Sequence, residues 1–473
     1  MLDPTPIPAS SVPIHLLQST DRPLTRWALG CLLLAVALAG CGRRTALVPT
    51  PHIMVGEPGR QQFEQVPTPL QTPEAPIVFF TDRQPEDDGG FLTFGHERSG
   101  AISFGTARVV TDPALDWPDL VRVSTAKQRR HRYGMLLDRV EIAGQVSPIE
   151  SLLSVVDGRL VYTQNAWDLF IDQLDTFDAE LNQQLQHDPD GEVILFVHGF
   201  HNDFESAAVR LAAIWHAGGR VGVPVLFSWP AGEKGLLPIA YNHDRESGEF
   251  SIRHLKIMLF ALARNPKVQR VHLIAHSRGT DVVVTTLREI KDDLWGVYGG
   301  SAFMRLAVGA QPNEFLDPPG DQPPKSAPDT LKLDTLVLAS ADIDRDVFIQ
   351  RFIVEQVTRL ARRTVIYTSP DDLALRASVL FTGGNSRRLG QQGYTDFPTH
   401  VRSLLTQLPS FEFIECHVHA KNSHAYAFEH PAALSDMIRL IRDATPAGTP
   451  RRPLHPIAPN FWRLDDDYLS PSD

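Results

Sequence analysis

From residue 192 onward, short segments that are almost wholly apolar alternate with segments of helical periodicity. The apolar segments are 193–200, 224–229, 271–277, 334–340, 364–369 and 411–419. The predicted helices are 205–216, 251–264, 280–293, 346–362 and 400–408, followed by a last one from Pro431. Strands that are apolar along their whole length are typical of parallel sheets covered on both faces. The sequence therefore predicts an α/β fold, with a mostly parallel sheet and helices on both faces.

The segments outside this region have a different character. Residues 77–163 contain short predicted strands and form a β-rich N-terminal extension that we expect to pack on the core. An amphipathic helix near 166–186 opens the α/β domain, which we place at 164–445. Residues 41–76 and 446–473 are rich in proline and lack a regular period, so we expect a tether and a loose tail.

Residues 1–40 have the pattern of a signal peptide. Their apolar run, 27–39, is shorter than the roughly 20 residues of a spanning helix but fits a secretory signal. It ends in Leu-Ala-Gly-Cys41, which resembles a bacterial lipoprotein signal. The resemblance implies cleavage before Cys41, lipid on its thiol and a protein held at the cell envelope. Because Gly42 stands in place of the Asp linked with inner-membrane retention, the resemblance also implies the outer membrane, with the protein facing the periplasm. An uncleaved anchor is the alternative.

Ser277 lies where an apolar strand runs directly into a predicted helix, in the sequence Leu-Ile-Ala-His-Ser-Arg-Gly-Thr. A nucleophilic serine at such a junction needs small residues two positions before and two positions after it, because the turn is tight. Ala275 and Gly279 meet this requirement. A serine that only caps the helix is the alternative. The strand before it and the helix after it favour a catalytic serine.

The strand 193–200 ends in His-Gly, which is typical of the loop that binds an oxyanion. A backbone N–H near Phe200 or His201 would act together with the N–H of Arg278, so that two fixed donors face the developing negative charge. We expect His198 to order this loop and not to react.

Trp229 ends the strand 224–229, and Tyr241 and Asp244 follow it. These three residues are expected at the edge where substrates bind in open α/β sheets. We expect them either to shape a substrate pocket or only to pack the loop.

Two groups of acids compete for the acid position. Asp372 follows the strand 364–369, and Asp342 and Asp344 follow the strand before it. In folds with this nucleophile turn the order along the chain is Ser, Asp, His, and the acid usually follows the later strand. We therefore predict Asp372, with Asp342 or Asp344 as the alternative.

Four histidines end or follow the last strand: His417, His419, His424 and His430. His424 lies in the loop between that strand and the final helix, from which a side chain reaches back to the serine, so it is the predicted base. His417 and His419 alternate along the strand, but no further ligands follow at a metal-binding spacing. We predict no metal site.

Together these segments resemble a bacterial family of α/β-hydrolases of unknown function that are serine-esterase-like. The matching segments span roughly 77–440 and include FFTDR, VILFVHGFHNDF, HLIAHSRGTDVV, TVIYTSPDDLALRAS and NSHAYAFEHPAALSDM. The resemblance implies the α/β-hydrolase fold, with Ser277, Asp372 and His424 at the nucleophile, acid and base positions. Ala275 in place of Gly is a departure from the pattern. The resemblance supplies no substrate.

The implied reaction is attack by Ser277 on an acyl carbonyl, followed by hydrolysis of the acyl-enzyme, and it needs no metal or organic cofactor. The expected substrate is an ester or lipid-like small molecule. The net charge of −11 and the lack of a large basic block in the sequence argue against a nucleic-acid partner. The sequence also contains no glycine-rich nucleotide-phosphate motif. Two alternatives stay open: transfer of the acyl group to an acceptor other than water, and a non-catalytic scaffold that keeps the fold.

Overall fold

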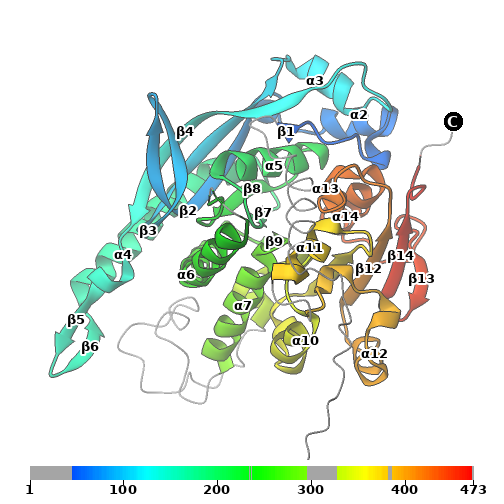
Figure 1. Ribbon diagram of the computed structural model, residues 1–473. Helices are drawn as coiled ribbons and strands as arrows, with labels where there is room; N and C mark the ends of the chain where they lie inside the picture. The colour runs from blue at the N-terminus through cyan, green and yellow to red at the C-terminus, as the bar shows by residue number, and fades with distance from the viewer. Residues whose placement is uncertain (1–44, 234, 236, 296–326, 382–385, 471–473) are drawn as a thin grey trace, which may run out of the picture.

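The computed structural model describes residues 45–233, 235, 237–295, 327–381 and 386–470. Its main element is a twelve-stranded sheet (Figure 1). The order of strands across it is β1-β4-β3-β2-β8-β7-β9-β10-β11-β12-β14-β13. The predicted signal peptide and Cys41 lie outside the described residues.

The strands of this sheet are β1 (Thr45–Ala46), β2 (Ala75–Asp88), β3 (Phe91–Asp112), β4 (Gly134–Val146), β7 (Glu192–Val197), β8 (Val223–Ser228), β9 (Arg270–His276), β10 (Leu333–Ala339), β11 (Arg363–Thr368), β12 (Phe411–His417), β13 (His455–Ala458) and β14 (Phe461–Asp465). A separate hairpin is formed by β5 (Leu153–Val156) and β6 (Arg159–Tyr162).

The helices are α2 (Glu57–Glu64), α3 (Trp117–Ser124), α4 (Gln164–Leu185), α5 (Phe204–Ala217), α6 (Leu237–Arg264), α7 (Gly279–Trp295), α9 (Ala327–Leu331), α10 (Arg345–Phe348), α11 (Leu373–Phe381), α12 (Thr399–Leu405), α13 (Tyr426–Glu429) and α14 (Pro431–Asp443). The predicted helix 346–362 is instead α10 followed by a π-helical turn and a short 3₁₀ turn.

In the order of the sheet, the strands from β8 through β7, β9, β10, β11 and β12 to β14 pair with one another in parallel, and the edge strand β13 is antiparallel to β14. At the centre, Ile274 of β9 lies between Phe196 of β7 and Val337 of β10. Every residue of β7 and β8 is buried, as their apolar sequences require. The predicted α/β fold with a mostly parallel sheet is confirmed.

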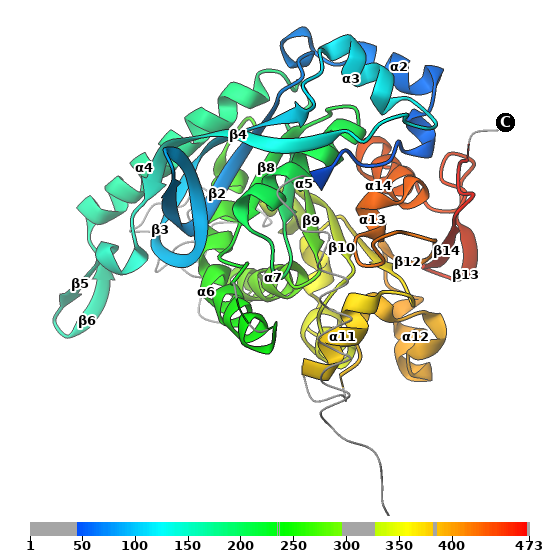
Figure 2. The ribbon, with the colours of Figure 1, turned by 45° about the horizontal axis from the view of Figure 1, so that its top comes forward.

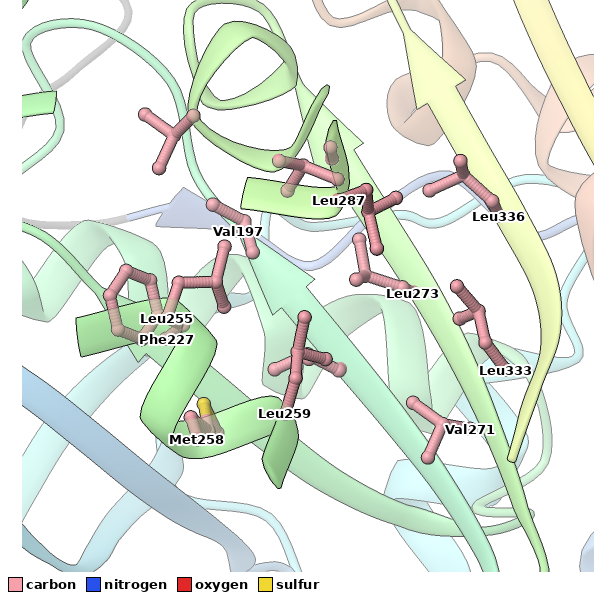
Figure 3. Close-up of a cluster of buried hydrophobic side chains, with 14 of the residues drawn as sticks. Val197, Phe227, Leu255, Met258, Leu259, Val271, Leu273, Leu287, Leu333 and Leu336 are labelled. Atoms are coloured by element: carbon pink, nitrogen blue, oxygen red, sulfur yellow. The ribbon is translucent and has the colours of Figure 1, made fainter. Parts of the chain in front are cut away.

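Helices cover both faces of the sheet (Figure 2). On one face, α4, α6 and α7 form a core with the sheet, and on the other face α5, α13 and α14 do so. Figure 3 shows part of the first core, where Leu255 and Leu259 of α6 lie over Val197 of β7 and Leu273 of β9. The two cores hold the parallel strands rigidly, so the loops at their carboxyl ends start from fixed positions.

The N-terminal extension continues the same sheet. Strand β2 pairs in parallel with β8, with Phe80 opposite Phe227, and β3 and β4 follow as antiparallel neighbours. The region is therefore joined to the α/β part through backbone hydrogen bonds.

Residues 45–76, for which the sequence predicts a tether, are packed instead. They contain β1 and α2, and Met54, Phe63 and Val66 are buried together. Proline here opens short helices, where its fixed φ and missing N–H cause no loss. Proline content was therefore a poor guide to a tether.

The segment after residue 446, for which the sequence predicts a loose tail, is also ordered. Strand β14 pairs in parallel with β12, and Phe461 and Leu464 are buried. Arg452 is fully buried and forms a two-point ion pair with Asp436 of α14, at 2.8 and 3.0 Å. The hydroxyls of Tyr367 and Tyr468 also donate to Asp436, both at 2.7 Å.

Among the helices in the described ranges, none combines the length and the apolar character needed to cross a membrane.

We predict that Arg452→Met lowers the free energy of unfolding by about 3–5 kcal/mol, because Asp436 stays buried without its cation. Urea unfolding monitored by circular dichroism measures this change. Arg451→Met is the matched control, since Arg451 pairs with Asp443 at the surface and its loss should cost less than about 1 kcal/mol. Equal losses of stability in the two variants would contradict the proposed contribution of the buried Arg452–Asp436 ion pair.

Candidate active site

The turn between β9 and α7 places Ser277 at the carboxyl edge of the sheet. Ser277 has a φ of 52°, a left-handed conformation that costs a non-glycine residue about 1–2 kcal/mol. Its N–H donates to the carbonyl of Ala339 at 3.0 Å, and its own carbonyl accepts from the N–H of Asp342 at 3.1 Å. These bonds to the end of β10 hold the strained turn.

Small residues around the turn are required by close backbone contacts. A Cβ at Gly279 would overlap the carbonyl oxygen of His198, and a Cβ at Gly199 would lie 2.6 Å from the Cβ of Ser277. Ala275 is fully buried inside β9. The predicted need for a small residue at 279 therefore has a visible steric cause, while the matching need at 199 was not predicted.

The structure brings Ser277, His424 and Asp372 together. His424 Nε2 lies 2.8 Å from Ser277 Oγ, and His424 Nδ1 lies 2.8 and 3.0 Å from the two oxygens of Asp372. Because the carboxylate only accepts, Nδ1 carries the proton and Nε2 is free to accept from the Ser277 hydroxyl. The geometry is that of a nucleophile, a base and an orienting acid.

The loop that carries His424 is fixed through its backbone. Ser340 Oγ donates to the His424 carbonyl at 2.9 Å, and His276 Nε2 donates to the same oxygen at 3.1 Å. Neither Ser340 nor His276 was predicted as a site residue. The sequence offered one signal for His276, its position at the end of β9 directly before Ser277.

The pKa of His424 is raised above its usual range. Burial lowers this pKa, but the negative charge of Asp372 and its hydrogen bond outweigh burial and stabilise the imidazolium. The side chain of Asp372 is fully buried, so its charge acts on the ring with little screening by water.

The alternative acids lie elsewhere. Asp342 accepts from the Tyr241 hydroxyl at 3.0 Å and pairs with Arg388 at 3.1 Å. Asp344 caps α10 by accepting from the N–H groups of residues 346 and 347. Neither carboxylate contacts His424 in the described residues, so Asp372 alone of the three has the geometry of the acid.

The other candidate histidines are also directed elsewhere. His419 and His430 both contact Asp466, and His417 lies 3.7 Å from Glu415. Only His424 of the four contacts Ser277 within the described part of the chain.

The two expected oxyanion donors are the N–H groups of Phe200 and Arg278. Within the described residues, neither has a hydrogen-bond acceptor. The alternative donor, His201, is occupied, because its N–H donates to Asp244 Oδ2 at 2.9 Å. Of the two candidates, Phe200 is thus the one whose N–H has no acceptor among the described residues.

Trp229, Tyr241 and Asp244 support the loop more than they line a pocket. Trp229 is fully buried and donates from Nε1 to the His198 carbonyl at 2.7 Å. Asp244 is fully buried and ties His201 to the N–H of Gly232. The ring of Tyr241 packs on that of Phe200, with 5.3 Å between the ring centres. For Trp229 and Asp244 the packing alternative describes the structure.

A twisted, mostly parallel sheet with a serine on the turn after a central strand defines an α/β-hydrolase. The family model "Alpha/beta hydrolase of unknown function (DUF900)" matches residues 173–443, and the chain belongs to this family. No curated protein and no solved structure matches the chain.

We predict that Asp372→Asn lowers kcat on the order of 10⁴-fold, because an amide facing His424 favours the wrong tautomer. Asp344→Asn should leave kcat close to that of the wild type, since Asn also caps helices well. Ester hydrolysis by the two folded variants tests the assignment. A larger loss at residue 344 would refute it.

Proposed function

We propose that this protein is a serine hydrolase that cleaves esters or related acyl compounds through an acyl-enzyme. The observation that carries the proposal is the hydrogen-bonded chain from Ser277 through His424 to Asp372. The N–H groups of Phe200 and Arg278, which have no acceptor among the described residues, add the donors that such a reaction needs.

In the proposed reaction, His424 Nε2 takes the proton of Ser277 as Oγ attacks the carbonyl carbon of the substrate. The carbonyl oxygen becomes an oxyanion and accepts from the N–H groups of Phe200 and Arg278. The carbon–oxygen bond to the leaving alcohol then breaks, and the imidazolium returns the proton to that alcohol. Water repeats the sequence on the acyl-enzyme, releasing the acid and restoring Ser277.

Asp372 acts throughout by charge. Its carboxylate accepts from Nδ1, which keeps the proton of the neutral ring there, and stabilises the imidazolium that forms at each step. This role accounts for the burial of an acid beside a histidine, an arrangement that would otherwise cost stability.

We further propose that the protein is a lipoprotein of the bacterial envelope, anchored through Cys41. The support is the sequence Leu-Ala-Gly-Cys41 at the end of a short apolar run. A membrane location suits a lipid-like ester as substrate.

We predict that Cys41→Ala gives an unprocessed or detached protein. Membrane fractionation and the mass of the mature chain measure this directly, with Cys416→Ala as the control, because Cys416 is buried in β12. Unchanged processing and unchanged membrane association in Cys41→Ala would defeat the anchoring proposal.

We predict that a fluorophosphonate labels the wild-type protein once, at Ser277. Ser277→Ala removes the attacking atom and His424→Ala removes the base, so neither variant should be labelled. Ser340→Ala is the control and should still be labelled, since Ser340 bonds the His424 carbonyl at 2.9 Å but takes no part in the proton transfer. Intact-protein mass spectrometry measures the added mass.

The labelling rate of the wild type should rise with pH. Because the pKa of His424 is raised, the midpoint should lie above the ordinary histidine value of about 6.5. Below the midpoint the ring is protonated and accepts no proton from Ser277. A folded protein that is neither labelled nor active on any ester tested would favour the scaffold alternative.

A further inference from the structure

Arg83 lies near the end of β2 in the FFTDR segment, outside the residues that the family model matches. Its side chain is fully buried, although it takes no part in the Ser277–His424–Asp372 arrangement. A buried guanidinium is costly unless its donors are satisfied, so its partners indicate what it does.

All five N–H donors of this guanidinium have acceptors. Nε donates to Ser228 Oγ at 2.8 Å. Nη1 donates to the backbone carbonyls of Gly95 and Ala231, both at 2.8 Å. Nη2 donates to the Asn202 carbonyl at 2.8 Å and lies 3.3 Å from His198 Nε2. None of these acceptors is a carboxylate. The guanidinium thus joins the loop after β7 to the loop after β8.

The contacts of His198 determine which ring nitrogen carries the proton. Nε2 lies 3.3 Å from Arg83 Nη2 and 3.2 Å from Ser228 Oγ, whose oxygen accepts from Arg83 Nε. Because Nε2 faces a guanidinium, which only donates, Nε2 is the acceptor and the ring proton is on Nδ1. Nδ1 then donates to the carbonyl of Gly199 at 3.0 Å. Burial and the charge of Arg83 both lower the pKa of His198 well below its usual range, so the ring stays neutral.

The Gly199 carbonyl belongs to the same peptide group as the Phe200 N–H. This peptide is trans, so the carbonyl and the N–H point in opposite directions. The Asn202 side chain also donates to the Gly199 carbonyl, at 3.3 Å. Holding the carbonyl from two sides therefore fixes the direction of the Phe200 N–H.

We propose that Arg83 is a positioning residue for the oxyanion site: it sets the tautomer of His198, which holds the Gly199 carbonyl and so aims the Phe200 N–H at the developing charge. This inference rests on the proposed hydrolase function. It makes the N-terminal part of the sheet a component of the catalytic apparatus.

The test compares Arg83→Lys and the wild type in hydrolysis of a p-nitrophenyl ester and in binding of a boronic acid. Lysine keeps the charge but lacks the planar fork, so it cannot reach both loops. We expect kcat to fall about 10²–10³-fold, as for loss of one oxyanion donor, with little change in KM. Affinity for the tetrahedral boronate should fall in parallel. The pH midpoint should stay at the wild-type value, because Asp372 sets the pKa of His424.

A second pair of variants keeps the test decisive if Arg83→Lys does not fold. His198→Asn retains a donor near the position of Nδ1, whereas His198→Gln retains a polar atom near the position of Nε2 only. We expect kcat to fall more for His198→Gln than for His198→Asn. The opposite order, or equal losses, would overturn the inference.

Arg98→Lys is the matched control. Arg98 lies in β3, is exposed, and donates to Ser247 Oγ at 3.0 Å. The kcat of the Arg98→Lys variant should equal that of the wild type. If the wild type is labelled by a fluorophosphonate and folded Arg83→Lys matches it in kcat and boronate affinity, the inference alone is overturned. A wild type that is never labelled overturns the proposed function, and this inference with it.

Discussion

The turn at Ser277 packs so closely on the loop after β7 that the carbonyl of His198 occupies the space of a side chain at Gly279. The left-handed serine raises its side chain clear of the helix that follows, and the bond from its N–H to Ala339 stabilises this conformation. A Cβ at Gly199 would likewise lie 2.6 Å from the Cβ of Ser277, so the loop that carries Phe200 packs directly on the nucleophile turn.

His424 and Asp372 are positioned independently of that contact. Asp372 follows β11 and His424 follows β12, and parallel pairing brings the carboxyl ends of these strands to the same edge as β9. Donors from β9 and from the end of β10 hold the His424 carbonyl and tie its loop to the sheet. A rigid sheet and a few polar contacts are sufficient to align three residues far apart in sequence.

The central strands and the three aligned residues were predictable because their signals are local. An apolar strand, a small residue near a serine, and the order Ser, Asp, His are each visible in a short stretch. The full support of the loops was not predictable, since Arg83 and Ser340 act through partners that only the folded chain brings near. Proline-rich composition suggested loose ends, yet buried Phe63 and Phe461 order both segments. Composition indicates how a segment behaves when it has no partners. Burial of a few large side chains can offset the conformational entropy that is lost when the segment is ordered.

The joining of β2 to β8 has a consequence for how such a chain can change over evolutionary time. Val78 pairs with Val225, and Arg83 donates to the carbonyl of Asn202, after β7, and to that of Ala231, after β8. A recombination event near residue 173 would combine a β2 from one ancestor with a β8 from another. Their register and the acceptors of Arg83 would then have to match by chance. The two parts of the gene are therefore expected to be inherited as one unit.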